Sequence, residues 1–344
     1  MAERTTIRVA AVQATPVFLD RDATVDRACA LVAEAAELGA QLVVLPEGFV
    51  PTYPEWTWRT RPWDHRARAL WARLRDEAVV VPGPATEALG HAARRAGVHL
   101  SIGVTERDPH GSSLYNTQLL FGADGTLLHR HRKLVLTGGE RLVWGGGDGS
   151  SITAVDTPLG RIGTLICWEN YMPLARTAMY AQGIDLYLAP TWDSSDAWVA
   201  TLRHIAREGR VFVIGVNSCI RAADVGADVP FHDEIWTNDD DWLSPGNTTI
   251  VGPDGDVIAG PLREQTGILT ADLDLAEARA LHHEFDAIGH YARSDVFRLV
   301  VDTTPRPSVS FDGAVQTPGT QAPRPRAERP ARSPSLKEST PATA

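Results

Sequence analysis

Short runs of apolar residues alternate along the chain with segments of helical periodicity. Ile7–Gln13 and Gln41–Leu45 are such runs, and they are typical of strands that are covered on both faces. Between them Asp22 is the expected helix N-cap and Gly39 the expected stop. The apolar positions of this helix recur at helical spacing: Val25, Ala28, Cys29, Val32, Ala35 and Ala36.

The same alternation continues through the chain. A helix is expected over Thr86–Ala96, closed by Gly97, and further helices at about 173–183 and 197–209. The expected strands are Val98–Val104, Arg161–Cys167, Asp185–Ala189 and Val211–Val216.

Two segments predict β-hairpins because Asp-Gly turns separate strand-like runs. Tyr115–Phe121 and Thr126–His131 flank the first turn, and Thr248–Val251 and Asp256–Ile258 flank the second. Strands, helices and hairpins together predict a layered α/β protein. Each half of the chain contains helix, buried strand and hairpin, which indicates internal pseudo-symmetry.

Composition narrows the class of protein. The chain is 43% hydrophobic and 22% charged, with a formal net charge of −10. This acidic balance argues against a nucleic-acid partner. No apolar run approaches the roughly 20 residues of a membrane span, and the N-terminus does not resemble a secretory signal. We therefore expect a cytoplasmic protein.

Composition changes near Pro305, where proline, arginine, serine and threonine become frequent. Such a segment cannot bury enough apolar area to fold alone. We expect a single domain over residues 1–304 and a disordered tail over 305–344, so that truncation after Asp302 leaves activity largely intact. The alternative is a partner-binding peptide at Pro323-Arg324-Pro325-Arg326.

The three cysteines do not form a disulfide framework, because their number is odd and no Cys-x-x-Cys pair is present. Cys29 lies on a helix stripe and Cys219 ends a buried strand, and both are expected to be structural. Cys167 ends another strand just before a helix that should begin at Pro173. Active sites collect at such strand ends, and a helix N-terminus favours a thiolate. Taken alone, however, Cys167 is better explained as a packed core cysteine at a strand end.

Two other segments change that balance. Glu47 directly follows the apolar run Leu42-Val-Val-Leu-Pro46, and a buried carboxylate there requires a partner or a chemical task. Lys133 closes the first hairpin, with Glu140 seven residues further along. The alternative for both segments is a solvated surface charge.

In this combination the sequence resembles the nitrilase branch of the nitrilase/amidase superfamily over roughly residues 6–300. The matching segments are Leu45-Pro-Glu47, His131-Arg-Lys133-Leu-x-x-Thr137-x-x-Glu140-Arg-x-x-Trp144-Gly, Cys167-Trp-Glu-Asn-Tyr-Met-Pro-Leu174 and Gly289-His-Tyr-Ala-Arg293-x-Asp295-Val-Phe297. Cys-Trp-Glu is more typical of nitrilases than of amidases or carbamoylases.

The resemblance implies a four-layer α-β-β-α sandwich, homodimers or larger spiral homo-oligomers, and no metal or organic cofactor. It also implies a catalytic set of Cys167 as nucleophile, Glu47 as base, Lys133 as charge stabiliser and Glu140 as second carboxylate. Such a set would convert a small-molecule nitrile to an acid and ammonia through a thioimidate and a thioester.

Substrate-binding residues are expected next to the same strand ends. Tyr53, Trp168 and Trp192 are expected to line an apolar pocket suited to aryl or arylalkyl nitriles, and Glu169 is assigned to the same group. The glycine-rich run at 145–149 lacks the Lys-Ser/Thr of a phosphate loop, so we expect a turn at the rim of the site. The pairs His282-His283 and His129-x-His131 lack a third ligand at metal-binding spacing.

Three alternative functions remain open. An amidase or carbamoylase on the same fold would form the thioester from an amide, and a cyanide hydratase would release formamide. A catalytically silent, filament-forming scaffold protein is an alternative from a different class, but it predicts a broken catalytic set.

Overall fold

Two seven-stranded β-sheets form the centre of the protein in the computed structural model, which describes residues 6–307. The first sheet has the order β14-β1-β2-β3-β4-β5, with β6 paired to β4. Its strands are β1 (Thr6–Gln13), β2 (Leu42–Val44), β3 (His99–Arg107), β4 (Leu114–Phe121), β5 (Leu127–Arg132), β6 (Trp144–Gly145) and β14 (Gly267–Asp274).

The second sheet has the order β11-β12-β10-β9-β8-β7, with β13 paired to β12. Its strands are β7 (Val155–Thr157), β8 (Gly160–Thr164), β9 (Leu186–Thr191), β10 (Phe212–Asn217), β11 (Cys219–Arg221), β12 (Trp242–Val251) and β13 (Val257–Arg263). In each sheet three neighbouring strands are parallel, β1-β2-β3 and β8-β9-β10.

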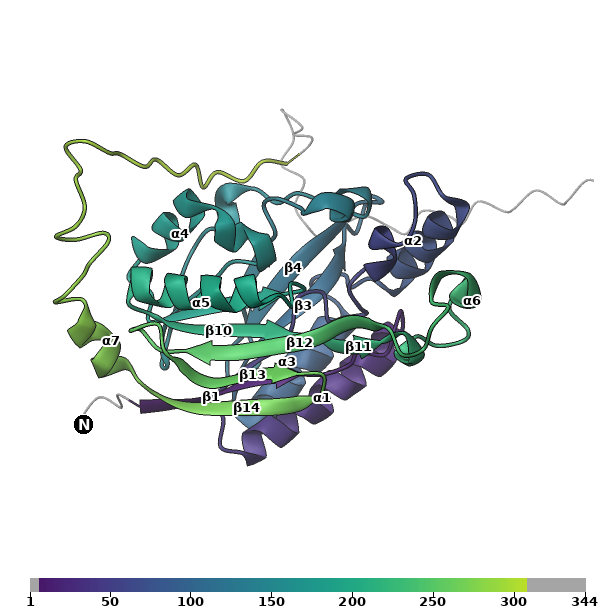
Figure 1. Ribbon diagram of the computed structural model, residues 1–344, viewed down its shortest axis with the longest axis horizontal. Helices are drawn as coiled ribbons and strands as arrows, with labels where there is room; N and C mark the ends of the chain where they lie inside the picture. The colour runs from purple at the N-terminus through teal and green to yellow at the C-terminus, as the bar shows by residue number, and fades with distance from the viewer. Residues whose placement is uncertain (1–5, 308–344) are drawn as a thin grey trace, which may run out of the picture. The chain divides into compact units, whose positions relative to one another are not determined.

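Helices cover the outer face of each sheet (Figure 1). The helices α1 (Arg21–Glu37) and α3 (Pro84–Ala96) lie against the first sheet, and α4 (Pro173–Tyr180) and α5 (Asp196–Gly209) lie against the second. Three further helices, α2 (His65–Glu77), α6 (His232–Ile235) and α7 (Leu275–Leu281), lie at the ends of the sandwich. The fold is the predicted four-layer α-β-β-α sandwich.

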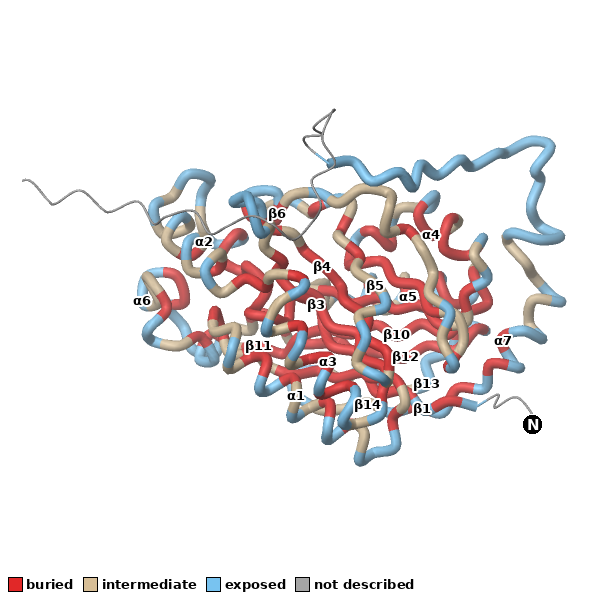
Figure 2. Tube along the Cα trace, turned by 180° about the vertical axis from the view of Figure 1, so that it is seen from behind, coloured by how far each residue is buried: buried red, intermediate tan, exposed pale blue. Residues whose placement is uncertain are grey.

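Successive side chains of β1 point to opposite faces of the first sheet, and their packing shows why the layers form. Val9 and Ala11 pack between the two sheets, whereas Ala10 and Val12 point to the opposite face and pack against α1 and α3. Both faces of the strand are buried, so nearly every residue is apolar. Figure 2 shows the result: both sheets are buried along most of their length.

Most predicted elements are confirmed, with differences at their ends. The first helix is capped by Asp20 rather than by Asp22, because the extended Asp20 accepts the N–H of Ala23 at 2.9 Å. Asp22 lies in the first turn, where its negative charge interacts favourably with the helix dipole and stabilises the helix. Gly97 ends α3 in the left-handed conformation, as predicted.

Both predicted hairpins are present, as β4-β5 and β12-β13. Strand β14 and helix α2 were not predicted from the hydrophobic pattern. β14 pairs with β1, from Thr6 opposite Asp274 to Gln13 opposite Gly267. A local pattern does not show which distant edge is available for pairing, so this strand becomes evident only in the folded chain.

Three further structural results complete the fold. The strand expected over Arg161–Cys167 ends earlier, at Thr164, and Cys167 instead begins the 3₁₀ turn η4 (Cys167–Tyr171). Among the helices that the structure describes, none combines the length and apolar character needed to cross a membrane. The predicted tail lies almost entirely outside residues 6–307, and disorder there stays a prediction.

Candidate active site

The four predicted catalytic residues come from four segments that meet at one edge of the sandwich. Glu47 follows β2, and Lys133 follows β5. Glu140 lies in the 3₁₀ turn η2 (Gly138–Leu142), and Cys167 begins η4 beyond the end of β8. Two sheets therefore contribute to the site, since β2 and β5 belong to the first sheet and β8 to the second.

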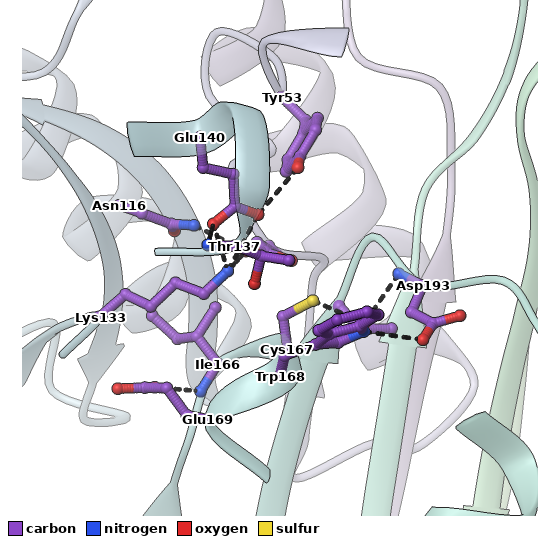
Figure 3. A network of polar contacts seen from close by, with 12 residues as sticks. Tyr53, Asn116, Lys133, Thr137, Glu140, Ile166, Cys167, Trp168, Glu169 and Asp193 are labelled. Carbon is purple, nitrogen blue, oxygen red and sulfur yellow. Dashed lines mark hydrogen bonds and ion pairs between the residues drawn. The ribbon is translucent and has the colours of Figure 1, made fainter. Parts of the chain in front are cut away.

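A buried ammonium joins two carboxylates at the centre of the site (Figure 3). Lys133 Nζ lies 2.7 Å from Glu47 Oε1 and 2.8 Å from Glu140 Oε2. All three side chains are essentially inaccessible to solvent. Asn116 Nδ2 donates a second hydrogen bond to Glu47 Oε1 at 2.6 Å, so this carboxylate is held from two directions.

The other oxygen of Glu47 is free to act. Oε2 is buried and has no hydrogen-bond partner among residues 6–307. Leaving a buried carboxylate oxygen unpaired costs free energy, so such an oxygen calls for an explanation such as a chemical role. Carboxylate oxygens of Glu47 and Glu140 and Sγ of Cys167 all lie within 4.8 Å of one another. The free oxygen of Glu47 is therefore suited to exchange a proton with a reacting group.

Burial and charge set the protonation states. Burial raises the pKa of the Glu47 carboxyl, and the Lys133 ammonium only partly offsets this effect. Burial alone would lower the pKa of Lys133, but Glu47, followed by Cys167 and Glu140, raises it above its ordinary value. The amine thus stays charged, as a charge-stabilising role requires.

The surroundings of the Cys167 thiol favour its protonated form. Burial, followed by the charge of Glu47, raises its pKa to about 12, although Lys133 opposes this shift. The helix α4 begins at Pro173, as predicted. A nucleophilic sulfur here needs a base to remove its proton.

Cys167 occupies a strained backbone conformation. Its φ is +52°, a region that non-glycine residues rarely adopt and that must be held by surrounding contacts. Asn170 supplies two of them, donating from Nδ2 to the carbonyl oxygens of Leu165 at 2.9 Å and of Cys167 at 2.8 Å. Thr191 at the end of β9 donates its hydroxyl to Cys167 Sγ at 3.3 Å.

The loop that carries Glu47 rests on the backbone of β3. A side chain at Gly103 would place its first carbon 2.3 Å from the carbonyl oxygen of Pro46 and 2.4 Å from the amide of Gly48. The Gly103 N–H also donates to Pro46 O at 3.1 Å. Only glycine permits this close approach, which fixes the height of Glu47 above the sheet.

Tyr53 connects the predicted aromatic residues to a catalytic carboxylate. The rings of Tyr53 and Trp192 stack at 4.2 Å with an interplanar angle of 5°. The Tyr53 hydroxyl donates to Glu140 Oε1 at 2.8 Å. Trp168, next to the sulfur in sequence, is half-exposed and donates from Nε1 to Asp193 Oδ2 at 2.9 Å.

Glu169 has a different location from the other predicted substrate-binding residues. Its carboxylate is buried and accepts the backbone N–H groups of Ile166 and Leu134, each at 2.6 Å. Figure 3 shows it on the opposite side of the Ile166 nitrogen from the Cys167 sulfur. The structure thus places Glu169 behind the site rather than in its wall.

Asn116 and Thr191 were not predicted. Asn116 is the first of three consecutive polar residues in β4, and Thr191 is the polar last residue of the otherwise apolar β9, so neither stands out on its own. The backbone carbonyl oxygen of Asn116 accepts the backbone N–H of Lys133, and this pairing places the side chains of Asn116 and Lys133 together beside Glu47. The role of Asn116 therefore becomes visible only in the folded protein.

The remaining candidates lie away from the reacting groups. Cys29 is half-buried between helices, and Cys219 is buried at the start of β11. His131 bonds to Glu169 and Ser151 through its two ring nitrogens. Among the residues described, the cluster with metal-ligand geometry is Glu47, Glu140 and Cys167, but the Lys133 ammonium already contacts both carboxylates.

Comparison with known proteins supports the same family. Residues 8–283 match the carbon–nitrogen hydrolase family profile. The chain is 47% identical over 308 residues to an aliphatic nitrilase of Sinorhizobium fredii, covering 89% of this chain and 98% of that protein. It is 44% identical to a bifunctional nitrilase/nitrile hydratase of Nicotiana tabacum, with 89% of each chain covered. Identity to nitrilase 1 of Arabidopsis thaliana is 41%, covering 90% and 91% of the two chains.

Solved structures show the same fold at lower identity. A carbon–nitrogen hydrolase of Helicobacter pylori aligns with a TM-score of 0.68 at 18% identity, covering 86% of this chain and 98% of that one. The Caenorhabditis elegans NitFhit protein aligns with a TM-score of 0.68 at 22% identity, covering 87% and 68%. The fold, the profile and the extended identity agree: the chain belongs to the carbon–nitrogen hydrolase family and, within it, to the nitrilases.

Proposed function

We propose that the protein hydrolyses an organic nitrile to a carboxylic acid and ammonia. The observation that carries this proposal is the convergence of Cys167 Sγ and the carboxylates of Glu47 and Glu140 within 4.8 Å, around the Lys133 ammonium. The 41–47% identity to proteins named as nitrilases supports a nitrile rather than an amide as substrate.

The first step forms a carbon–sulfur bond. Glu47 accepts the thiol proton at its free oxygen Oε2, and the sulfur of Cys167 attacks the nitrile carbon. The electron pair released from the triple bond moves to nitrogen, which takes up the proton from Glu47, and a thioimidate results. Lys133 stabilises the negative charge that develops on nitrogen.

Two waters complete the reaction. Glu47 deprotonates the first water, which adds to the thioimidate carbon. Cleavage of the carbon–nitrogen bond with protonation of the leaving nitrogen then releases ammonia and leaves a thioester. The second water attacks the thioester, the carbon–sulfur bond breaks, and the carboxylic acid leaves as Cys167 regains its proton.

Glu140 and Tyr53 support this chemistry indirectly. Glu140 holds Lys133 through both carboxylate oxygens, at 3.0 and 2.8 Å, and Tyr53 fixes Glu140 by its hydroxyl. A second carboxylate keeps the amine charged even when Glu47 is protonated during turnover.

The aromatic wall supports an apolar substrate. Trp192, which is partly exposed and stacks on the buried Tyr53, would offer flat apolar surface beside the site, and the half-exposed Trp168 would contribute at its rim. We propose that aryl, arylalkyl and aliphatic nitriles are the substrates to compare, since a relative is named an aliphatic nitrilase.

Partial nitrile hydration is a second candidate activity. Relatives from Lupinus angustifolius and Nicotiana tabacum are named bifunctional nitrilase/nitrile hydratases. In the tetrahedral intermediate, loss of the sulfur instead of ammonia would release an amide. The ratio of amide to acid then reports which bond breaks.

The test is turnover of matched nitrile and amide panels, with ammonia measured and products identified. We expect acid and ammonia from at least one nitrile, and a covalent mass increase on Cys167 during turnover. Cys167→Ala should lose both the adduct and the activity. Turnover of amides alone, or normal turnover by Cys167→Ala, would contradict the proposal.

We also propose a cytoplasmic homodimer or larger spiral homo-oligomer. Tyr171 and Leu174, which are largely exposed apolar side chains of η4 and α4, support burial of this helical face against a second copy. Light scattering measures the assembly size, and a monomer at working concentration would contradict this part.

A further inference from the structure

The Glu169 carboxylate bridges two segments of the active site. Oε1 accepts the N–H of Leu134 at 2.6 Å, and Oε2 accepts the N–H of Ile166 at 2.6 Å. Leu134 directly follows Lys133, and Ile166 directly precedes Cys167. One side chain therefore connects the backbone beside the ammonium to the backbone beside the thiol.

These two segments belong to different sheets. The Lys133 segment continues β5 of the first sheet, and the Cys167 turn follows β8 of the second. Side-chain packing alone would allow the two sheets to slide slightly, whereas two short charge-assisted hydrogen bonds define a fixed separation. The connection crosses the sandwich at the point where the reacting groups meet.

The carboxylate is itself held in place. His131 Nε2 lies 3.0 Å from Glu169 Oε2, and His131 Nδ1 lies 3.0 Å from Ser151 Oγ. The side chains of His131 and Glu169 are fully buried. Because both carboxylate oxygens already accept protein N–H groups, Glu169 is suited to orient the site and not to contact substrate.

The strain at Cys167 gives this contact its importance. A φ of +52° persists only when neighbouring bonds hold the turn. Asn170 holds the carbonyl groups of Leu165 and Cys167, on either side of Ile166, and Glu169 holds the amide of Ile166. Loss of the Ile166 contact would let the turn relax and carry the sulfur away from Lys133.

We propose that Glu169 is a positioning residue that sets the separation between Cys167 Sγ and Lys133 Nζ. This inference rests on the proposed function for its effect on turnover, but its effect on the thiol can be measured without any nitrile. It replaces the sequence-based assignment of Glu169 to substrate binding with a different role.

The test is Glu169→Gln, which keeps the shape of the side chain but replaces one acceptor oxygen by an NH₂ donor. One of the two backbone N–H groups then faces another donor, and the bridge is broken on that side. We expect kcat to fall by about 10²-fold, the effect of a displacement of roughly 1 Å. KM should change by less than about twofold, because no substrate contact is lost.

Alkylation of Cys167 by iodoacetamide, followed by mass spectrometry of its peptide, tests the geometry directly. The sulfur displaces iodide, and the thiol proton is released. In Glu169→Gln this reaction should be slower at a fixed pH, because the thiolate loses the nearby Lys133 charge. A wild-type alkylation profile together with a wild-type kcat, or a rise in KM at unchanged kcat, would overturn the proposal.

Asp185→Asn is the matched control. Asp185 Oδ2 also accepts a backbone N–H, that of Arg161 at 2.8 Å, but it precedes β9 at the end opposite Thr191. Loss of this hydrogen bond should lower the free energy of unfolding without changing the Cys167 alkylation profile. An equal change of that profile in both variants would reduce Glu169 to a general stability role and overturn the proposal.

Glu169→Asp provides a second route if the glutamine variant does not fold. It keeps the charge but is one methylene shorter, so it can reach only one of the two amides, and the same readouts apply. If no nitrile is turned over by the wild-type protein, the proposed function fails, whereas the alkylation experiment still decides the role of Glu169.

Discussion

The hydroxyl of Thr191 donates to Cys167 Sγ at 3.3 Å, and its oxygen accepts the N–H of Asp193 at 2.9 Å. The second contact orients the hydroxyl so that its hydrogen points to the sulfur. A hydrogen bond to a thiolate favours the charged form. Thr191 therefore opposes the effect of burial, which raises the pKa of the thiol.

Thr191→Val is expected to raise the pKa of Cys167 further, because valine has nearly the same shape but cannot donate. A shift of about one unit would slow alkylation at fixed pH about tenfold. The measurement is the pH dependence of Cys167 alkylation. Thr201→Val is the control, since Thr201 lies on the exposed face of α5 and contacts Tyr171 and Ala197. Identical profiles for wild type and Thr191→Val would contradict the role.

Individual residues differ in how far sequence reveals them. Glu47, Lys133, Glu140 and Cys167 were found because each belongs to a motif, and the structure brings them together. Glu169 also belongs to a motif, but a motif gives position along the chain and not the direction of the side chain. Ile166 and Leu134 contact the Glu169 carboxylate through backbone N–H groups. Nearly every residue has such a group, so the identities of these two residues do not predict the contact.

Strand β5 shows how one element combines a structural and a chemical task. Its end delivers Lys133 to the site, while His129 and His131 lie along the same strand. Burial, together with the charge of His131, lowers the pKa of His129 to about 4. An unfolded histidine has a pKa of about 6.5. Between this pH and about 4, His129 is therefore mostly protonated in the unfolded chain but not in the folded protein.

The protein should lose stability as the pH falls from about 6.5 towards about 4. In that window the unfolded chain binds a proton at His129 and the folded protein does not, so acid favours unfolding. The loss from this group between about pH 7 and about pH 5 is about 2 kcal/mol.

His129→Gln should remove this part of the pH dependence, measured by urea unfolding at both pH values. His110→Gln, a change at an exposed loop position, should retain it. An undiminished loss of stability in His129→Gln would show that another group is responsible.

At the level of elements, sequence periodicity predicted most helices and strands but not their pairing. The turn at Cys167 illustrates the limit: the apolar run Ile162–Ile166 continues the pattern of a strand, yet pairing stops at Thr164. The chain leaves the sheet there because Glu169 and Asn170 offer alternative hydrogen-bond partners to the backbone, and the strand pattern does not contain that information.

For the molecule as a whole, the compact unit extends to Arg306. The Arg306 N–H donates to Asp148 Oδ2 at 2.7 Å, beside the turn that contains Ser151. We therefore propose a domain boundary just beyond Arg306, slightly later than the boundary expected at residue 304.

Truncation after Pro307 is expected to leave kcat within about twofold of wild type and the free energy of unfolding within about 0.5 kcal/mol, because it removes no contact seen in the described part. Turnover and urea unfolding check this. Truncation after Asp302 removes the Arg306–Asp148 contact and provides the comparison. A large loss of activity in the longer variant would show that residues beyond 307 contribute to the site or to assembly.

The division of the site between two sheets has a consequence for the origin of the fold. Residues 6–145 supply parallel strands, a hairpin, the two carboxylates and the ammonium, whereas residues 155–263 supply parallel strands, a hairpin and the thiol. If the sandwich arose by duplication, the two copies have since diverged in chemistry, because one now supplies the charged groups and the other supplies the thiol. Neither copy alone would hold the proposed reaction centre, so covalent fusion keeps its two parts in one molecule.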